Sequence, residues 1–113
     1  MSEAPKLKRP MGGMPIYEPL YLQNGIRTTV GELTLLELNF GISKDQADAM
    51  EKDEFYAWQI KLSWLSQQGD GGFSRYDVCK SLYGLSFQQI IAMPPEELFP
   101  IYKPVEVEWR KVR

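Results

Sequence analysis

The 113-residue chain contains no histidine and only one cysteine, Cys79. Without histidine it lacks the commonest general base and metal ligand, so the usual catalytic triads and zinc sites are excluded. One cysteine cannot build an internal disulfide framework. No segment approaches the roughly 18 apolar residues of a membrane span, and the N-terminus lacks the apolar core of a secretory signal. We therefore expect synthesis in a reducing cytoplasm, no membrane partner and no cofactor.

Cys79 is the remaining candidate for catalysis. Lys80 stands beside it and Arg75 one turn earlier, and such cations lower a thiol pKa. Because the chain offers no histidine and no evident acyl-transfer partner, we instead expect a buried, small hydrophobic residue. The sequence therefore predicts no catalytic residue and no metal ligand, and an enzyme is the function class that it supports least.

The composition indicates one ordinary globular domain, with 43% hydrophobic and 25% charged residues. A chain of this length buries very roughly two-thirds of its unfolded surface without disulfides or metal. Residues 1–15 hold three prolines and few large side chains, so we expect an N-terminal arm. We expect a single α+β domain over residues 16–102 and a C-terminal strand or extended arm over residues 103–113.

A β-hairpin is predicted over residues 16–30. Two runs rich in β-forming residues lie on either side of Asn24-Gly25, which is the strongest short hairpin signal because a two-residue type I′ turn needs positive φ at both positions. Pro19 cannot donate to a ladder, so its strand should lie at an edge. The next segment, 32–38, fits a strand or a helical turn, and we expect a third extended segment.

Three capping boxes predict the helices that follow. In each, a serine and a side chain three residues later satisfy free backbone N–H groups at a helix start. The first box begins a long core helix that continues to Gly69, where a loop follows, and the others begin short helices that stop at Gly84 and before Pro94. A last turn over 95–99 is closed by Pro100. The boxes are Ser43 to Gln46, Ser74 to Asp77, and Ser86 to Gln89.

The C-terminal segment 103–109 alternates with period two, which predicts a strand or extended arm with Val105, Val107 and Trp109 on one side. The fold class is therefore α+β. We expect a small antiparallel hairpin or meander on the N-terminal side, packed with a helical unit of one long and two or three short helices, and extended termini.

Gly84-Leu85-Ser86 resembles the turn of a DNA-binding helix-turn-helix. However, Lys80 occupies a position where that motif favours a small residue, and the next helix, 87–91, has no positive charge with which to contact bases. We therefore expect a plain corner between two helices and no nucleic-acid partner.

Between residues 31 and 60 acids outnumber bases seven to two. The run does not match a calcium loop, because the central glycine is missing and a helix is expected there. The acids form either a solvated helix face or a surface for a partner with basic arms, and copies of this chain have such arms. Surplus aromatic residues would anchor a protein partner. The expected protein-interface residues are Tyr17, Tyr21, Asp45, Asp48, Glu51, Trp58, Trp64 and Trp109.

From Tyr17 to Phe99, the order of parts resembles the tail assembly chaperones of long-tailed bacteriophages. Two departures from that family's pattern are Leu36, where an arginine often precedes the glutamate, and Leu38-Asn39, in place of a proline-centred stretch. The resemblance lies in Leu20 to Gly25 followed by Glu32-Leu33-Thr34-Leu35 and Glu37, and in Leu82-Tyr83-Gly84-Leu85-Ser86-Phe87-Gln88-Gln89-Ile90 with Met93-Pro94-Pro95-Glu96-Glu97-Leu98.

The resemblance implies a non-enzymatic protein of the host cytoplasm that binds the tape-measure protein and delivers tail-tube subunits, with a longer version made by frameshifting. An apolar groove beside the long helix, carrying Trp58 and Trp64, would shield a hydrophobic helix of the partner. The main alternative is a minor structural virion or connector protein whose arms order against neighbouring subunits, including other copies in a homo-oligomer. A small DNA-binding regulator is the third class considered.

Overall fold

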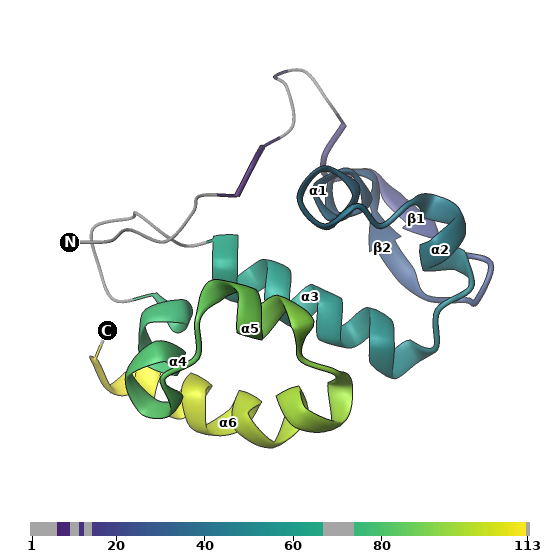
Figure 1. Ribbon diagram of the computed structural model, residues 1–113. Helices are drawn as coiled ribbons and strands as arrows, with labels where there is room; N and C mark the ends of the chain where they lie inside the picture. The colour runs from purple at the N-terminus through teal and green to yellow at the C-terminus, as the bar shows by residue number, and fades with distance from the viewer. Residues whose placement is uncertain (1–6, 10–11, 13–14, 67–73, 113) are drawn as a thin grey trace. The chain divides into compact units, whose positions relative to one another are not determined.

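The computed structural model describes residues 7–9, 12, 15–66 and 74–112. Two strands and six helices follow one another in these residues, which confirms the α+β class (Figure 1). The chain divides into an N-terminal unit, Leu7–Trp58, and a C-terminal unit that begins at Gln59. The residues from 16 to 102, expected as one domain, contribute to both units. The division falls inside one helix, α3 (Lys52–Ser66).

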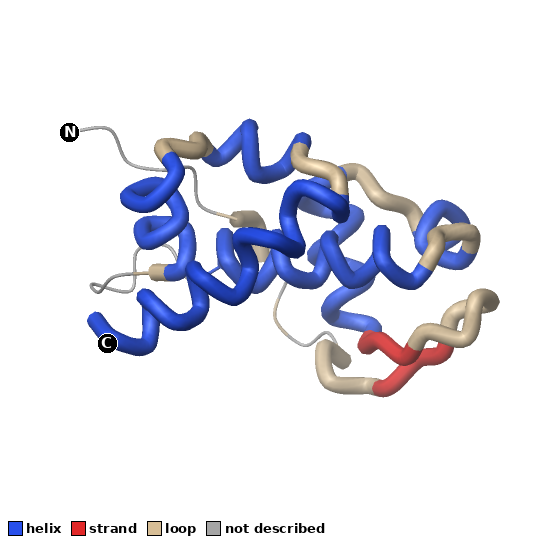
Figure 2. The backbone as a smooth tube through the Cα atoms, turned by 90° about the horizontal axis from the view of Figure 1, so that it is seen from below, coloured by secondary structure: helices blue, strands red, loops and turns tan. Residues whose placement is uncertain are grey.

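The predicted hairpin is present in the N-terminal unit. Strands β1 (Pro19–Tyr21) and β2 (Arg27–Thr29) pair antiparallel, with Leu20 opposite Thr28. Figure 2 shows the two short strands side by side in red. The described residues contain no third strand, so the sheet consists of this hairpin alone.

The turn of the hairpin differs from the expected type. Gly25 has a φ of 85°, but no other type of residue in the described part of the chain has a positive φ, so Asn24 does not adopt the type I′ conformation. The Gly25 N–H donates to the Leu22 carbonyl at 2.9 Å, and the Leu22 N–H donates to the Ile26 carbonyl at 2.9 Å. The connection is therefore a three-residue loop with a left-handed glycine at its end.

The third extended segment expected over residues 32–38 is wrong, because these residues lie in helix α1 (Val30–Phe40). Thr29 caps the helix start, where its hydroxyl accepts a hydrogen bond from the Glu32 N–H at 3.0 Å. Gly41 ends the helix with a φ of 71°. The leucine- and glutamate-rich composition suits a helix, and both ends supply partners for free backbone groups.

Part of the expected N-terminal arm lies against α1. The Lys8 N–H donates to Asn39 Oδ1 at 2.6 Å, and Asn39 Nδ2 donates to the Lys8 carbonyl at 2.9 Å. The remainder of the arm, apart from Leu7, Arg9, Gly12 and Pro15, lies outside the described residues, as does the loop expected at Gly69.

The long helix expected from Ser43 is instead two helices. The predicted capping box is confirmed, since Ser43 Oγ accepts from the Gln46 N–H at 3.1 Å and Gln46 Oε1 accepts from the Ser43 N–H at 2.8 Å. Helix α2 (Lys44–Asp48) then ends at Ala49, and α3 begins at Lys52. A capping box fixes where a helix begins, but it carries no information about where the helix ends.

The other two capping boxes and the glycine stop are confirmed in the C-terminal unit. They begin α4 (Arg75–Tyr83) and α5 (Phe87–Ala92). Each cap satisfies a backbone N–H that has no partner inside its helix. The capping pairs are Ser74 with Asp77 and Ser86 with Gln89, and Gly84 ends α4 with a φ of 68°.

The expectations for the C-terminal segment are wrong. Helix α6 (Pro95–Val112) continues through Pro100 and replaces the strand or extended arm expected over residues 103–113, of which residue 113 lies outside the described part. Pro100 and Pro104 are both exposed. Prolines on the solvent side of a helix let the backbone bend around a core, so the helix tolerates them where tertiary packing holds its other face.

The buried side chains supply most of the stability of each unit, since burying one large apolar side chain contributes about 1.5–3 kcal/mol. In the C-terminal unit, Lys61 on α3 is also buried and its Nζ donates to the Ile91 carbonyl of α5 at 2.9 Å, so these helices lie together. The buried apolar residues are Leu22, Leu36, Ile42, Ala47, Phe55 and Ala57 before Gln59, and Ile60, Leu62, Trp64, Leu65, Tyr76, Val78, Cys79, Ile90, Leu98 and Val105 after it.

Candidate protein interfaces

The hairpin exposes two large aromatic side chains. Tyr17 is 85% exposed and Tyr21 is 68% exposed. Tyr21 belongs to β1, and Tyr17 precedes that strand by two residues. A tyrosine ring offers apolar area with a polar tip, and contacts of this kind recur at protein interfaces. Both residues were expected at an interface, and their exposure leaves them accessible to a partner.

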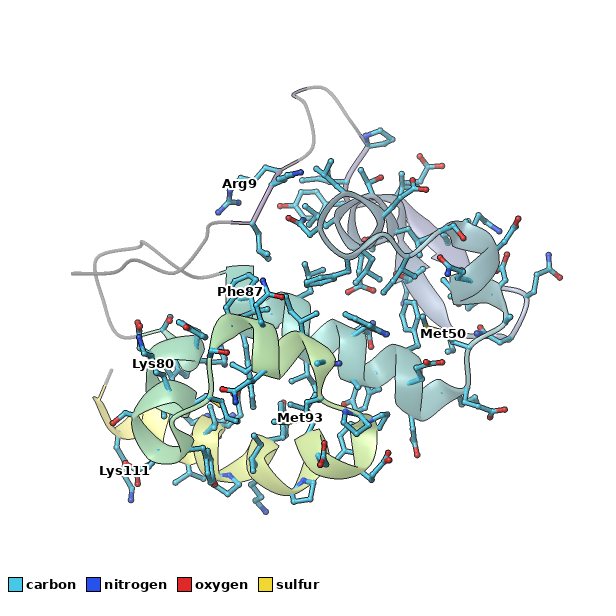
Figure 3. The ribbon with its side chains drawn as sticks, viewed as in Figure 1. Arg9, Met50, Lys80, Phe87, Met93 and Lys111 are labelled. Atoms are coloured by element: carbon cyan, nitrogen blue, oxygen red, sulfur yellow. The ribbon has the colours of Figure 1, made fainter. Side chains whose placement is uncertain are left out.

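The acidic segment after α1 is attached to the turn of the hairpin. Asn24 Nδ2 donates to the carbonyl oxygens of Ala47 at 2.8 Å and Met50 at 2.9 Å. Met50 lies at the junction of α2 and α3 (Figure 3). The first bond gives a carbonyl in the last turn of α2 a partner outside the helix, and the second holds the backbone between α2 and α3, so the two bonds account for the break between these helices. Sequence pattern alone misses this because the partner comes from a distant part of the chain.

Asp48, an expected interface residue, is engaged inside the N-terminal unit. Its Oδ1 accepts from the Gln23 N–H at 2.9 Å, and its Oδ2 pairs with Lys44 Nζ at 2.9 Å. The Gln23 hydrogen bond first, and then the Lys44 ammonium, lower the pKa of Asp48 below its ordinary value of 3.8. Asp48 therefore holds α2 to the hairpin, whereas Asp45 and Glu51 are exposed to solvent.

The tryptophans do not form the expected apolar groove beside the long helix. Trp64 is fully buried, so the expectation that it contacts a partner in such a groove is wrong. Trp58 is half-buried, and its ring centroid lies 5.0 Å from that of Phe40 in a tilted arrangement. The two tryptophans of α3 therefore serve the packing within the chain, as aromatic side chains in a small domain commonly do.

Trp64 and Trp109 meet through a polar cluster in the C-terminal unit. Glu106 Oε2 accepts from Trp64 Nε1 at 3.1 Å and from Arg75 Nε at 2.6 Å. The Arg75 guanidinium carbon lies 3.7 Å from the centroid of the half-buried Trp109 ring. Tyr102 stacks on Trp64 with centroids 6.1 Å apart. This cluster joins α3, α4 and α6, and it gives both tryptophans a structural explanation.

A second candidate surface lies between α4 and α6, where none of the expected interface residues is found. An open groove of about 490 Å³ separates the end of α4 from the C-terminal half of α6. Leu82 is 46% exposed, and Tyr83 and Val107 are each 42% exposed. The residues that line it, referred to below as the α4–α6 groove, are Leu82, Tyr83, Lys103, Pro104, Val107 and Glu108.

The sequence does not predict the α4–α6 groove, because its α6 residues share a face only in a helix, and the sequence pattern there predicts a strand or extended arm. In α6, Lys103, Pro104 and Val107 recur at spacings of three and four, which place them on one helix face. The period-two interpretation assigned Val107 to the same side as the buried Val105. Beyond the groove, Lys80 and Lys111 extend from α4 and α6 into solvent (Figure 3).

Cys79 lies fully buried in α4. Burial raises the pKa of its thiol from 9.0 to about 11, so the thiol stays protonated at neutral pH despite the neighbouring bases. Within the described residues no group of three or more His, Cys, Asp or Glu side chains could hold a metal ion. In the same part of the chain, every helix is too short or too polar to cross a bilayer.

Comparison of the chain with family models, with curated proteins and with solved structures gave no match.

Proposed function

We propose that this chain is a non-enzymatic binding protein that acts as a chaperone in the assembly of a bacteriophage tail. The observation that carries the proposal is the exposure of Tyr17 and Tyr21 on the hairpin, since two tyrosines left 85% and 68% exposed offer anchors for a protein partner. The resemblance to tail assembly chaperones supplies the expected partners, the tape-measure protein and the tail-tube protein.

The hairpin tyrosines belong to the same unit as the exposed acids Asp45 and Glu51. Hydrogen bonds from Asn24 and to Asp48 hold the acidic segment against the turn of the hairpin. The tyrosine rings would supply apolar contact, while the carboxylates would favour basic segments and speed their encounter. Because exposed charges are screened by salt, the acidic contribution should fade as ionic strength rises.

The binding test uses the full chain with the tape-measure and tail-tube proteins encoded by the same phage. The double variant Tyr17→Ser and Tyr21→Ser should weaken the complex by about ten-fold or more, because two aromatic anchors are lost. The matched control is Tyr56→Ser, which removes a tyrosine that is 60% exposed on α3 of the same unit. Equal affinity for the double variant and the wild type would contradict the assigned surface.

Charge reversal tests the acids separately. The variant Asp45→Lys with Glu51→Lys should bind more weakly at low salt and approach the wild type at high salt. Asp48 is left in place because its carboxylate holds α2 to the hairpin. Unchanged binding at low salt would remove the acids from the proposed interface.

Counting copies of the protein by mass spectrometry distinguishes the chaperone from the structural alternative. An assembly factor should be abundant in the lysate of infected cells and absent from purified particles. A fixed number of copies in each particle would overturn the chaperone proposal and make the chain a minor virion or connector protein.

A further inference from the structure

We propose that the α4–α6 groove binds an acidic amphipathic segment of a partner protein, whose apolar side chains lie in the groove while its carboxylates contact the cations around it. The proposal does not depend on the chaperone function, because it concerns the C-terminal unit while the hairpin tyrosines belong to the N-terminal unit.

Four of the lining residues of the groove offer apolar surface to solvent, and covering them would remove that surface from water. The groove volume of about 490 Å³ lies within the range of about 300–1,000 Å³ that is usual for sites binding compact ligands. The groove therefore suits a few apolar side chains of a short segment. The four residues are Leu82 and Tyr83 at the end of α4, and Pro104 and Val107 on α6.

Positive charge surrounds this apolar surface. Lys103 lines the groove, and Arg110 follows it by seven residues, close to two helical turns, so both lie on one side of α6. Two further lysines, one on α4 and one on α6, each lie one turn from a lining residue (Figure 3). The four exposed cations are Lys80, Lys103, Arg110 and Lys111.

Most of this positive charge is not compensated. Among the described residues, Lys80, Lys103 and Arg110 form no ion pair. Lys111 Nζ contacts Glu108 Oε1 at 3.1 Å, but the two side chains are 65% and 41% exposed, and exposed pairs of this kind contribute little to stability. The surroundings of the groove are therefore positive although the chain has a formal net charge of −2. Charge complementarity favours an acidic occupant.

The apolar lining favours a protein segment over the other polyanions that such cations attract. Nucleic acid binds mainly through its phosphates and gains little from covering Leu82 and Val107. Membrane surfaces take up apolar side chains that project from a helix face, whereas these side chains line a concave surface between two helices. A segment with apolar and acidic residues uses both features, as amphipathic helices do when they bind in apolar grooves.

A synthetic peptide tests the groove in the full chain. The probe has about 15 residues, enough to form a helix, with leucines on one face and glutamates beside them. One control peptide carries lysine in place of glutamate, and a second has the composition of the probe with its leucines spread around the helix. Calorimetric titration should give an affinity for the probe at least about ten-fold higher than for either control. Equal affinities, or no binding of the probe, would overturn the proposal.

Val107→Asp places a negative charge in the groove and should weaken binding of the probe by about ten-fold or more. The control is Leu38→Asp, which adds the same charge at a side chain that is 41% exposed on α1 of the other unit. Thermal unfolding followed by circular dichroism verifies that both variants fold. Unchanged binding to Val107→Asp, or equal weakening by Leu38→Asp, would place the contact elsewhere and overturn the proposal.

The cations are tested without altering the apolar lining. Lys103→Glu with Arg110→Glu should weaken binding of the probe at low salt, and the difference from the wild type should shrink as salt rises. The control is Arg27→Glu with Lys52→Glu, which changes the net charge equally at two exposed cations of the N-terminal unit. An equal loss in both double variants would mean that net charge, and not the groove, attracts the probe.

Two further measurements distinguish the other occupants of the groove. A DNA duplex, or a vesicle of anionic lipid, should bind more weakly than the probe. Tighter binding of either one, lost in the variant with Lys103→Glu and Arg110→Glu, would make the surface a general polyanion site and overturn the proposal. Sedimentation of the chain alone should show one copy at the concentrations used for titration, and a dimer that Val107→Asp dissociates would assign the groove to a second copy instead.

Discussion

The buried indole of Trp64 donates a hydrogen bond to Glu106, with Nε1 and Oε2 3.1 Å apart across a separation of 42 residues in sequence. The same oxygen accepts from Arg75 on α4, so one carboxylate holds α3 and α4 to α6. Glu106 is only 9% exposed, and a charge at such a position needs partners for its oxygens. The fold of the C-terminal unit therefore depends on a polar contact inside an apolar core.

Glu106→Ala should lower the free energy of unfolding by about 2–4 kcal/mol, because it leaves the Trp64 N–H and the Arg75 guanidinium without this acceptor. Glu108→Ala is the matched control on the same helix. Its pairing with Lys111 is exposed, so its loss should cost no more than about 0.5 kcal/mol. Urea unfolding followed by tryptophan fluorescence measures both, and equal losses for the two variants would contradict the structural assignment.

Gly31 lies where the chain before β1 crosses the start of α1. A Cβ built at this position would lie 2.6 Å from both the Cβ and the carbonyl oxygen of Ile16, and the Gly31 N–H donates to that oxygen at 3.1 Å. Alanine is the better helix former, by about 1 kcal/mol. Because the clash involves backbone, Gly31→Ala should nevertheless destabilise the chain by about 1–3 kcal/mol.

The control for this clash is Gly12→Ala, since a Cβ at Gly12 meets no atom within 4 Å. Thermal unfolding of the two variants separates a general cost of replacing glycine from the specific contact with Ile16. A melting temperature for Gly31→Ala at or above that of the wild type would show that the segment at Ile16 can move away from α1.

Asp48 should make stability depend on pH in the acid range. Its pKa in the folded chain lies below the ordinary value of 3.8 because the Gln23 N–H, and then Lys44, favour the charged carboxylate. A lowered folded pKa gives a contribution that is complete above the unfolded pKa and is lost as pH falls through the folded pKa. Unfolding free energies measured from pH 6 downward should therefore fall less steeply for Asp48→Asn than for the wild type below about pH 4.

The exposed acid Glu51 provides the comparison for Asp48. Glu51→Gln removes one negative charge from the same acidic segment but leaves the contact with Gln23 intact. The steep acid dependence should remain in this variant. If both substitutions flatten the profile equally, the effect comes from net charge and not from the hydrogen bond to the hairpin.

Cys79 should make stability depend on pH in the alkaline range. Burial raises its folded pKa to about 11, so its contribution to stability is complete below the unfolded value of 9.0 and is lost as pH rises toward 11. The difference in unfolding free energy between wild type and Cys79→Ala should therefore shrink between these values. Taking the difference between the two chains removes the titration of lysines and tyrosines that both contain, and a difference that stays constant would contradict the raised pKa.

The parts of the fold that the sequence predicts well are those set by neighbours three or four residues apart. All three serine capping boxes are present, because a cap needs only a short local arrangement of side chain and backbone. The break between α2 and α3 could not be predicted this way, because it depends on Asn24 reaching the carbonyls of Ala47 and Met50 from the hairpin.

The candidate surfaces also divide into those that depend on local sequence and those that depend on contacts between distant parts of the chain. The exposure of Tyr17 and Tyr21 follows from a short strand at an edge, and the proline in that strand made an edge predictable. The burial of Trp64 and the α4–α6 groove both depend on where α6 packs. Since residues 103–109 were assigned to a strand, the side chains of that groove could not be placed.

The strand or extended arm was wrongly predicted over residues 103–109 because three apolar residues cannot distinguish the period of two of a strand from the period of 3.6 of a helix. Val105 and Trp109 are four apart and lie on one side of a helix, but Val107 falls on the other side and is 42% exposed while Val105 is fully buried. Pro100 and Pro104 added an apparent stop. Tertiary packing of the buried face outweighs the cost of both prolines.

Pro104→Ala should raise the free energy of unfolding by about 1–3 kcal/mol, because alanine restores the N–H that can donate to the Pro100 carbonyl and removes the ring clash with it. The control is Pro95→Ala, since Pro95 is the first residue of α6, where proline is favourable and no intrahelical donor is lost. That variant should be neutral or slightly destabilised. Circular dichroism unfolding measures the stability of both variants. A strand or extended arm over residues 103–109 would have no such carbonyl to satisfy, so equal stability of Pro104→Ala and wild type would count against the continuous helix.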